Sequence, residues 1–294
     1  MSKKQNHKNK NDHITIPEST LKLFVPEGSF KFSFLDLKSM EIIEKGASQY
    51  HKECNYFPKA FDKSCQSFET GIGNLRAKIG DAEKQGLNLT YNVSILTENV
   101  KQLIFLHTAR EPETLNFVME KEHGEKLIND MKSFITMQGM LNAKTAKAID
   151  DSRKIFASGK TKREYFYDDN LFRIQCDSFM EKVKNYKATI VRIPQNISAT
   201  FLLTPFHFTQ VGNVFHFVLS PRHAICLYPS KMYDGLFNSG GIIYDIEDAE
   251  SVESIYRHDI KMVKQAKNQH LIGEKHILEK ILQIKSNMIE GERV

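Results

Sequence analysis

The sequence lacks the patterns that would place it in a membrane or in an oxidising compartment. No apolar run reaches about 18 residues, the length needed to span a bilayer, and the N-terminus has no apolar signal-peptide core. The four cysteines include no C-x-x-C pair, which argues against a zinc ribbon or a thioredoxin-type motif. We therefore expect a cytoplasmic protein, with Cys65 as a buried thiol in a helix seam.

Phosphate-binding loops and nucleophile motifs are also missing. Gly71-Ile-Gly73 is followed by Arg76 where a dinucleotide loop needs a third glycine. Gly159-Lys-Thr161 resembles the end of a P-loop, but Lys154 stands where its first glycine belongs. No serine or cysteine lies in a nucleophile elbow or a papain-like signature. The sequence thus argues against an ATP or GTP site and specifies no reaction.

Positive charge is concentrated at the N-terminus. The net charge of the 294-residue chain is +5, but residues 1–12 hold four lysines and one aspartate, so the remaining residues carry only +2. We expect residues 1–12 to be a disordered basic tail and residues 13–294 to form one domain. The tail is either a solvated arm or a weak, salt-sensitive attractor of phosphates.

Apolar spacing predicts a helical block within residues 58–185. Six apolar residues recur at steps of three and four from Phe61 to Ile79, which is typical of one helix stripe. A second helix is predicted over about 92–109 and a third over about 113–141. A fourth extends from there to about 156, and another covers about 170–183. Pro112 is expected to end the second of these. Two C-terminal helices are predicted near 250–266 and around Ile277–Ile284.

Alternation of period two predicts strands on both sides of that block. They are expected at 30–34, 41–43, 188–193, 199–206, 214–219 and 224–228. Short turns between the late strands favour antiparallel neighbours. We therefore predict an α+β fold, a mainly antiparallel sheet built from N-terminal and late strands, with the helical block inserted and helices at the C-terminus.

A hairpin around Gly212 puts five apolar residues on one face in either plausible register. They are Phe206, Phe208, Phe215, Phe217 and Leu219. The alternation places His207 and His216 together on the other face, beside His223. These histidines face solvent or a partner, or they bind a metal, although no carboxylate has helpful spacing.

Three further polar residues interrupt apolar pattern. Arg110 lies three residues after His107 at a helix end, where both cations cap carbonyls or Arg110 clamps a phosphate or carboxylate. Glu69 lies beside the seam of the long helix, as a solvated edge residue or a site carboxylate. His13 precedes an Ile-x-Ile fragment, as a strand residue or a proton shuttle.

Taken in order, these positions resemble a bacterial family, domain-of-unknown-function family 4238. The match rests on His13-Ile-Thr-Ile-Pro17, Leu21-Lys-Leu-Phe24, Phe68-Glu69, Arg110-Glu-Pro112, Leu203-Thr-Pro205 and Leu219-Ser-Pro221. The proline after His13 is displaced by one position, and the aspartate that follows Thr-Ser in the family has no counterpart here. The resemblance implies, as analogy, a bacterial defence or mobile-element setting.

Two functions follow as expectations. The first is a defence or mobile-element effector that processes nucleic acid or nucleotide, with His13, Glu69 and Arg110 as catalytic residues and Thr204, Ser220 and Arg222 binding substrate. The second is a non-catalytic interaction module, whose polar residues are structural and whose helical block binds a protein partner. No membrane is expected as a partner, no metal site is assigned, and no cofactor is specified.

Overall fold

The computed structural model describes residues 11–13, 16–50, 52–54, 59–86, 93–110, 121–157, 176–177, 179–233, 243–264, 266 and 268–291. The helices are α1 (Glu18–Leu21), η1 (Lys22–Phe24), η2 (Ala47–Gln49), α2 (Lys59–Lys84), α3 (Val93–Arg110), α5 (Lys121–Met137), α6 (Ala143–Ala157), α9 (Ser230–Tyr233), α10 (Ala249–Val263) and α11 (Lys275–Gly291). The strands are β1 (Asn11–His13), β2 (Lys31–Asp36), β3 (Glu41–Gly46), β4 (Lys52–Cys54), β5 (Tyr186–Arg192), β6 (Phe208–Val211), β7 (Val214–Ser220), β8 (His223–Pro229), β9 (Ile243–Asp245) and β10 (His270–Gly273).

A five-stranded sheet forms the centre of the structure, in the order β6-β7-β8-β5-β9. All its pairings are antiparallel except that of β5 with β9. Val211 pairs with Val214 across a two-residue turn, and Gly212 occupies that turn at φ 59°, a conformation that glycine adopts without strain. This register pairs Phe208 with Phe217, one of the two registers that the sequence allows.

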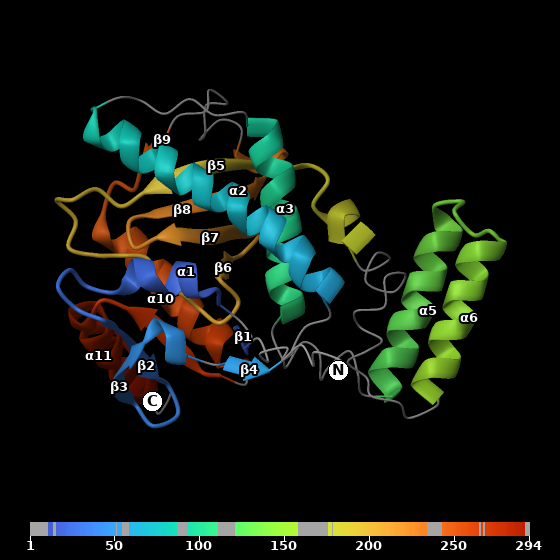
Figure 1. Ribbon diagram of the computed structural model, residues 1–294, viewed down its shortest axis with the longest axis horizontal. Helices are drawn as coiled ribbons and strands as arrows, with labels where there is room; N and C mark the ends of the chain where they lie inside the picture. The colour runs from blue at the N-terminus through green and yellow to red at the C-terminus, as the bar shows by residue number, and fades with distance from the viewer. Residues whose placement is uncertain are drawn as a thin grey trace, which may run out of the picture.

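Helices α2 and α3 cover one face of this sheet (Figure 1). The second half of the predicted seam of α2 is buried there, with Ile72 and Ile79 each at most 5% exposed. The predicted inward residues of α3 are Leu96, Val100, Leu103 and Ile104, and all four are buried in the same cluster. The five apolar residues of the Gly212 hairpin also belong to this cluster, which confirms their shared face.

The opposite face of the sheet packs against α10 and against elements from both ends of the chain. A three-stranded antiparallel sheet has the order β10-β2-β3, so an N-terminal hairpin pairs with a late strand. An isolated bridge between Leu203 and Ile272 connects β10 to the segment before β6. One hydrophobic cluster contains Phe32 of β2, Cys226 of β8 and Ile260 of α10. The two ends of the sequence thus share one core.

The fold class predicted from the sequence is confirmed as α+β, with antiparallel and mixed sheets. The strands divide among three sheets, however, because β1 and β4 form a third, two-stranded one. The strand predicted at 199–206 is wrong apart from the bridge at Leu203. Its side chains are buried in succession, but its backbone is bonded to separate partners, such as Phe201 N to Pro221 O, rather than to one neighbouring strand.

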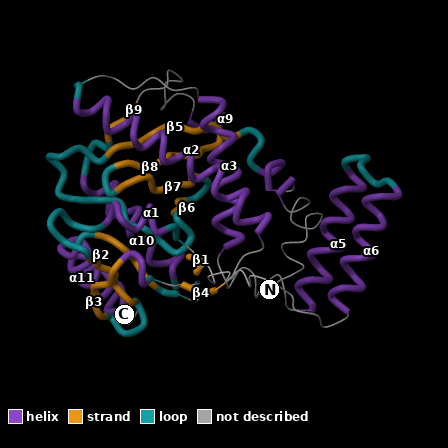
Figure 2. The backbone as a smooth tube through the Cα atoms, viewed as in Figure 1, coloured by secondary structure: helices purple, strands orange, loops and turns teal. Residues whose placement is uncertain are grey.

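Helices α5 and α6 form an antiparallel hairpin with a small core of its own, made of Ile128, Ile135 and Ile149. Figures 1 and 2 show the hairpin at the right of the view, beside the sheets. The predicted helix over 113–141 is confirmed from Lys121 to Met137. Residues 111–120 lie outside the described residues. Of the helix predicted over 170–183, residues 176–177 and 179–182 are helical, and residues 170–175 and 178 lie outside the described residues. No helix in the described part of the chain is long and apolar enough to cross a bilayer.

A row of polar residues runs across the α10 face of the sheet. Thr209 of β6 pairs with His216 of β7, which in turn pairs with Cys226 of β8. Burial lowers the pKa of His216 to about 4, with His258 adding to the effect, and raises that of Cys226 to about 12. At neutral pH the imidazole is therefore uncharged and the thiol is protonated, so this pair does not form a reactive thiolate.

Asp259 of α10 is fully buried beneath this row, where Thr209 donates a hydrogen bond to it. Burial raises the pKa of Asp259 well above its ordinary value, and the bond from Thr209 only partly opposes this. The folded protein therefore keeps a proton that the unfolded chain releases above the ordinary pKa of 3.8. Stability consequently falls as the pH rises from that value toward the raised pKa.

Asp259→Asn should remove this pH-dependent loss, because asparagine keeps the acceptor for Thr209 and cannot ionise. We expect the melting temperature of the variant to exceed that of the wild type at about pH 8, with the gap narrowing at about pH 4. Thermal unfolding followed by circular dichroism at several pH values measures this gap. A gap that stays constant with pH, or widens in acid, would show that Asp259 does not hold the extra proton.

Candidate active site

A small cavity lies between α1, α2, α3 and the sheet. Its lining consists of Ser19, Thr20, Glu69, Ile72, Arg76, Leu103, His107, His207 and Phe217. The two histidines are almost fully buried at its floor, whereas Ser19 is exposed and Glu69 and Arg76 are half-buried at its rim. The cavity volume is about 10 Å³, room for roughly one water molecule. A polar rim thus leads to a buried imidazole pair.

The imidazoles of His107 and His207 contact each other directly at this floor. His107 Nε2 and His207 Nδ1 are 3.2 Å apart, and the rings meet edge to face with centroids 4.4 Å apart. A hydrogen bond between two ring nitrogens requires that one carries the proton and the other accepts it. The contact therefore involves Nε2 of His107 and Nδ1 of His207.

His207 reaches this position through an unusual backbone conformation. Its φ is 64°, in the left-handed region, in the turn just before β6, where its N–H donates to the carbonyl of Thr204. The ring consequently stacks on Phe217, with centroids 4.5 Å apart. The prediction that His207 and His216 share a face is therefore wrong, since simple alternation does not extend through this turn.

Glu69 and Arg76 come from one face of α2, seven residues apart, or about two helical turns. Burial lowers the pKa of Arg76 to about 10, and the Glu69 carboxylate opposes this shift. The guanidinium is therefore charged at neutral pH. One terminal nitrogen donates to Thr20 Oγ1 at 3.3 Å, while Nε has no hydrogen-bond partner among the described residues. Arg76 was not among the predicted site residues.

The residues predicted as catalytic are only partly placed by the structure. Glu69 lines the cavity. His13 ends β1 and Arg110 ends α3, but their side chains lie outside the described residues, so their roles stay predictions. His107 is 1% exposed, so it does not act as a solvent-facing cap of α3.

Of the residues predicted to bind substrate, Thr204 lies nearest to the histidine pair. It is fully buried, donates from its hydroxyl to the carbonyl of Phe208, and supports the turn that carries His207.

Ser220 and Arg222 lie elsewhere, in the turn between β7 and β8. One terminal nitrogen of Arg222 contacts the carbonyl oxygens of Pro194, Ile197 and Ala199 at 3.1, 2.8 and 2.8 Å. The Ser220 hydroxyl accepts from the backbone N–H groups of Arg222 and His223. Both side chains thus hold the turn and the neighbouring loop together.

His223 extends this turn into a second polar cluster. Its Nδ1 lies 3.1 Å from Ser220 Oγ and its Nε2 lies 3.0 Å from Glu83 Oε1. Burial lowers the pKa of His223, against the pull of Glu83, which favours a neutral ring that donates to the carboxylate. Two backbone donors already occupy the Ser220 hydroxyl, which disfavours a nucleophilic role. Glu83 is also 14 residues from Glu69, about 21 Å along α2.

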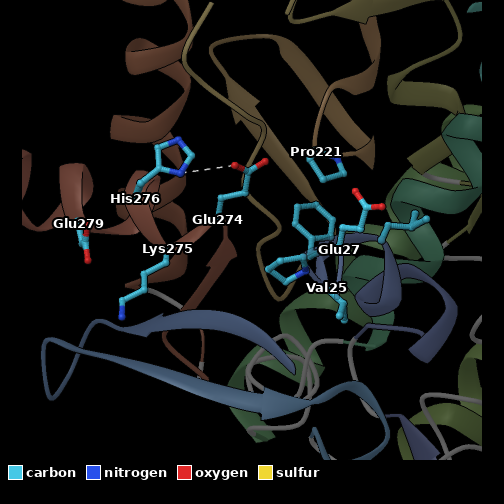
Figure 3. Close-up of a pocket in the computed structure, with 10 residues that line it drawn as sticks. Val25, Glu27, Pro221, Glu274, Lys275, His276 and Glu279 are labelled. Carbon is cyan, nitrogen blue, oxygen red and sulfur yellow. Dashed lines mark ion pairs between the residues drawn. The ribbon is translucent and has the colours of Figure 1, made fainter. Parts of the chain in front are cut away.

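A wider groove of about 560 Å³ lies between the segment Leu23–Glu27 and the start of α11 (Figure 3). In Figure 3, Glu27 and Pro221 lie on one side, and Glu274 and His276 form an ion pair on the other, with 3.5 Å between His276 Nδ1 and Glu274 Oε2. Pro221 lines the groove and lies between Ser220 and Arg222, two of the residues that the sequence predicts to bind substrate. The groove is separate from the histidine pair.

Within the described residues, no group of three or more histidine, cysteine, aspartate or glutamate side chains is arranged to hold a metal ion. The lining of the cavity offers two imidazoles, a carboxylate, two hydroxyls and a guanidinium. Comparison of the chain with protein-family models, curated proteins and solved structures found no match in any of the three.

Proposed function

We propose that this protein cleaves phosphate esters of nucleic acid or nucleotide by general acid–base catalysis at the His107–His207 cavity. The observation that carries the proposal is the charged Arg76 at the rim of a cavity whose floor is a pair of contacting imidazoles. Phosphate oxygens are the ligands that a planar guanidinium binds best, and imidazole is the commonest acid and base in enzymes.

In this proposal His207 Nε2 takes a proton from the attacking oxygen, which is a water molecule or a ribose hydroxyl, as a new bond to phosphorus forms. The bond from phosphorus to the leaving oxygen breaks, and the leaving oxygen receives a proton from the imidazolium or from solvent. His107 holds the ring of His207 in place through Nδ1. Arg76 binds the phosphate, and the Glu69 carboxylate favours the charged state of Arg76.

The cavity holds about one water molecule as it stands, so a nucleotide engages it from the rim. The mouth is formed by the exposed Ser19 of the four-residue helix α1 and by half-buried side chains of α2. The predicted roles of His13 as proton shuttle and Arg110 as anion clamp remain part of the proposal. So do the bacterial family resemblance, the defence or mobile-element setting and the cytoplasmic location.

The experiment incubates the full-length protein with end-labelled RNA, single-stranded and duplex DNA, and nucleotides, and compares the wild type with Arg76→Gln. We expect the wild type to cleave at least one substrate class. Loss of a charge-assisted hydrogen bond should raise KM about 10- to 100-fold, with a smaller change in kcat. Arg257→Gln, at an exposed position on α10, is the matched control. An unchanged KM in Arg76→Gln would remove Arg76 from the substrate site.

The alternative is the non-catalytic interaction module. The small size of the cavity and the buried, mutually bonded histidines favour it, since both suit a core that serves only stability. Under this alternative no substrate class is turned over by the wild type, and substitutions at His107 and His207 lower the melting temperature only.

A further inference from the structure

The turn between α5 and α6 displays three large apolar side chains to solvent. Met137 is 78% exposed, Met140 54% and Leu141 43%. Isolated exposed apolar residues are common, but three within five positions of one turn form a continuous apolar tip. We call these three residues the apolar tip. The small core of the hairpin lies further down the two helices, at Ile135 and Ile149.

The backbone of this turn is fully organised, so the apolar side chains are held outward. Gly139 adopts φ 66°, and Met140 N donates to the carbonyl of Ile135, which closes the end of α5 with a helix-ending turn. The Asn142 side chain then accepts from the N–H groups of Lys144 and Thr145, and Thr145 Oγ1 accepts from Asn142 N. The apolar tip is thus presented by a capped turn.

Charge around the apolar tip has one sign. Residues 131–149 contain three lysines, Lys132, Lys144 and Lys147, and no aspartate or glutamate. All three lysines are exposed. The nearest acidic residues are Asp130, Asp150 and Asp151, toward the other end of the hairpin. The lysines lie within about 5 to 9 Å of the tip along the helix axes, at 1.5 Å per residue.

We propose that the apolar tip inserts into the surface of a bilayer rich in anionic lipid, with the three lysines at the level of the phosphate headgroups. Insertion depths of about 5 to 10 Å at the headgroup boundary match the spacing between the tip and its lysines. A convex tip flanked by flexible cations suits a deformable, anionic surface better than a preformed protein pocket. The proposal is independent of the proposed catalysis, and it departs from the sequence-based expectation that no membrane is a partner.

The sequence contains no tryptophan, so a single introduced indole reports on one position. The test uses the full-length Leu141→Trp variant with vesicles of phosphatidylglycerol and phosphatidylcholine, and with vesicles of phosphatidylcholine alone. We expect the emission of the indole to shift to the blue and to be quenched by brominated acyl chains only with the anionic vesicles. Phe30→Trp is the matched control, because Phe30 is 94% exposed and directly precedes β2, away from the tip.

The charge requirement is tested by adding Lys132→Gln, Lys144→Gln and Lys147→Gln to the Leu141→Trp variant. We expect a partition coefficient about 100-fold lower, or about 5-fold for each lysine. All of the substituted side chains are exposed, and circular dichroism checks that folding is retained. The proposal is overturned if Leu141→Trp shows no shift with anionic vesicles, if Phe30→Trp shifts equally, or if neutral vesicles bind equally well. It is also overturned if the apolar tip is shielded by a protein and by no lipid.

Discussion

His207→Asn is expected to lower the turnover of a phosphate ester by about 100- to 10,000-fold, the range in which removal of a general acid or base usually falls. Asparagine is the appropriate replacement, since it tolerates the left-handed conformation that His207 adopts at φ 64°. Its side-chain amide can also keep a hydrogen bond to His107. The fold should therefore persist while proton transfer is lost, which separates catalysis from stability.

Steady-state kinetics on the substrate class cleaved by the wild type measure this loss, and thermal unfolding monitors the fold. His258→Asn is the matched control, because His258 lies on α10 and its Nδ1 bonds locally, to the carbonyl of Ser254. We expect the control to retain nearly full turnover. Wild-type turnover in His207→Asn would contradict the assignment of His207 as acid and base.

Arg222→Ala is expected to destabilise the protein by about 3 kcal/mol, since it removes the charged donor shared by three carbonyl oxygens. The value is below the sum for three fully buried bonds, because Arg222 is half-buried and water can reach part of the loop. Denaturant unfolding of the variant and of Arg257→Ala measures the difference, and the exposed control should change by less than about 0.5 kcal/mol.

This second prediction also decides between two roles for Arg222. A residue that mainly binds substrate, as the sequence predicts, would lower activity when removed and leave the free energy of unfolding nearly unchanged. The contacts to Pro194, Ile197 and Ala199 lead us to expect the opposite result, in which the free energy of unfolding falls more than the activity does. A stable Arg222→Ala variant with impaired turnover would restore the sequence-based prediction.

Much of the architecture could be predicted from the sequence, because periodicity reports directly which side chains share a face. The spacing from Phe61 to Ile79 predicted α2, and the alternation around Gly212 predicted the hairpin and its buried phenylalanines. The strand at 199–206 was predicted incorrectly, because alternation reports burial and does not report where the backbone hydrogen bonds go. β10 was missed, since a four-residue strand carries too short a pattern.

The candidate site was only partly predictable. Glu69 was identified, and Arg76 could have been, because Glu69, Ile72 and Arg76 follow helical spacing and share one face of α2. The position of His207 depends on its positive φ, and nothing in the sequence indicates that a histidine adopts this conformation. The meeting of His107 with His207, 100 residues apart, depends on how α3 packs on the sheet, which local patterns do not encode.

The most direct test of the proposed site is nitrogen NMR of histidine-labelled full-length protein during titration with a nucleoside monophosphate. His107 and His207 are assigned by comparison with the His107→Asn and His207→Asn variants, and Arg76→Gln provides a protein with a weakened anion site. We expect the nucleotide to shift the ring-nitrogen resonances of both histidines in the wild type, and to shift them much less in Arg76→Gln. Resonances that stay unchanged at saturating nucleotide would contradict the proposed site.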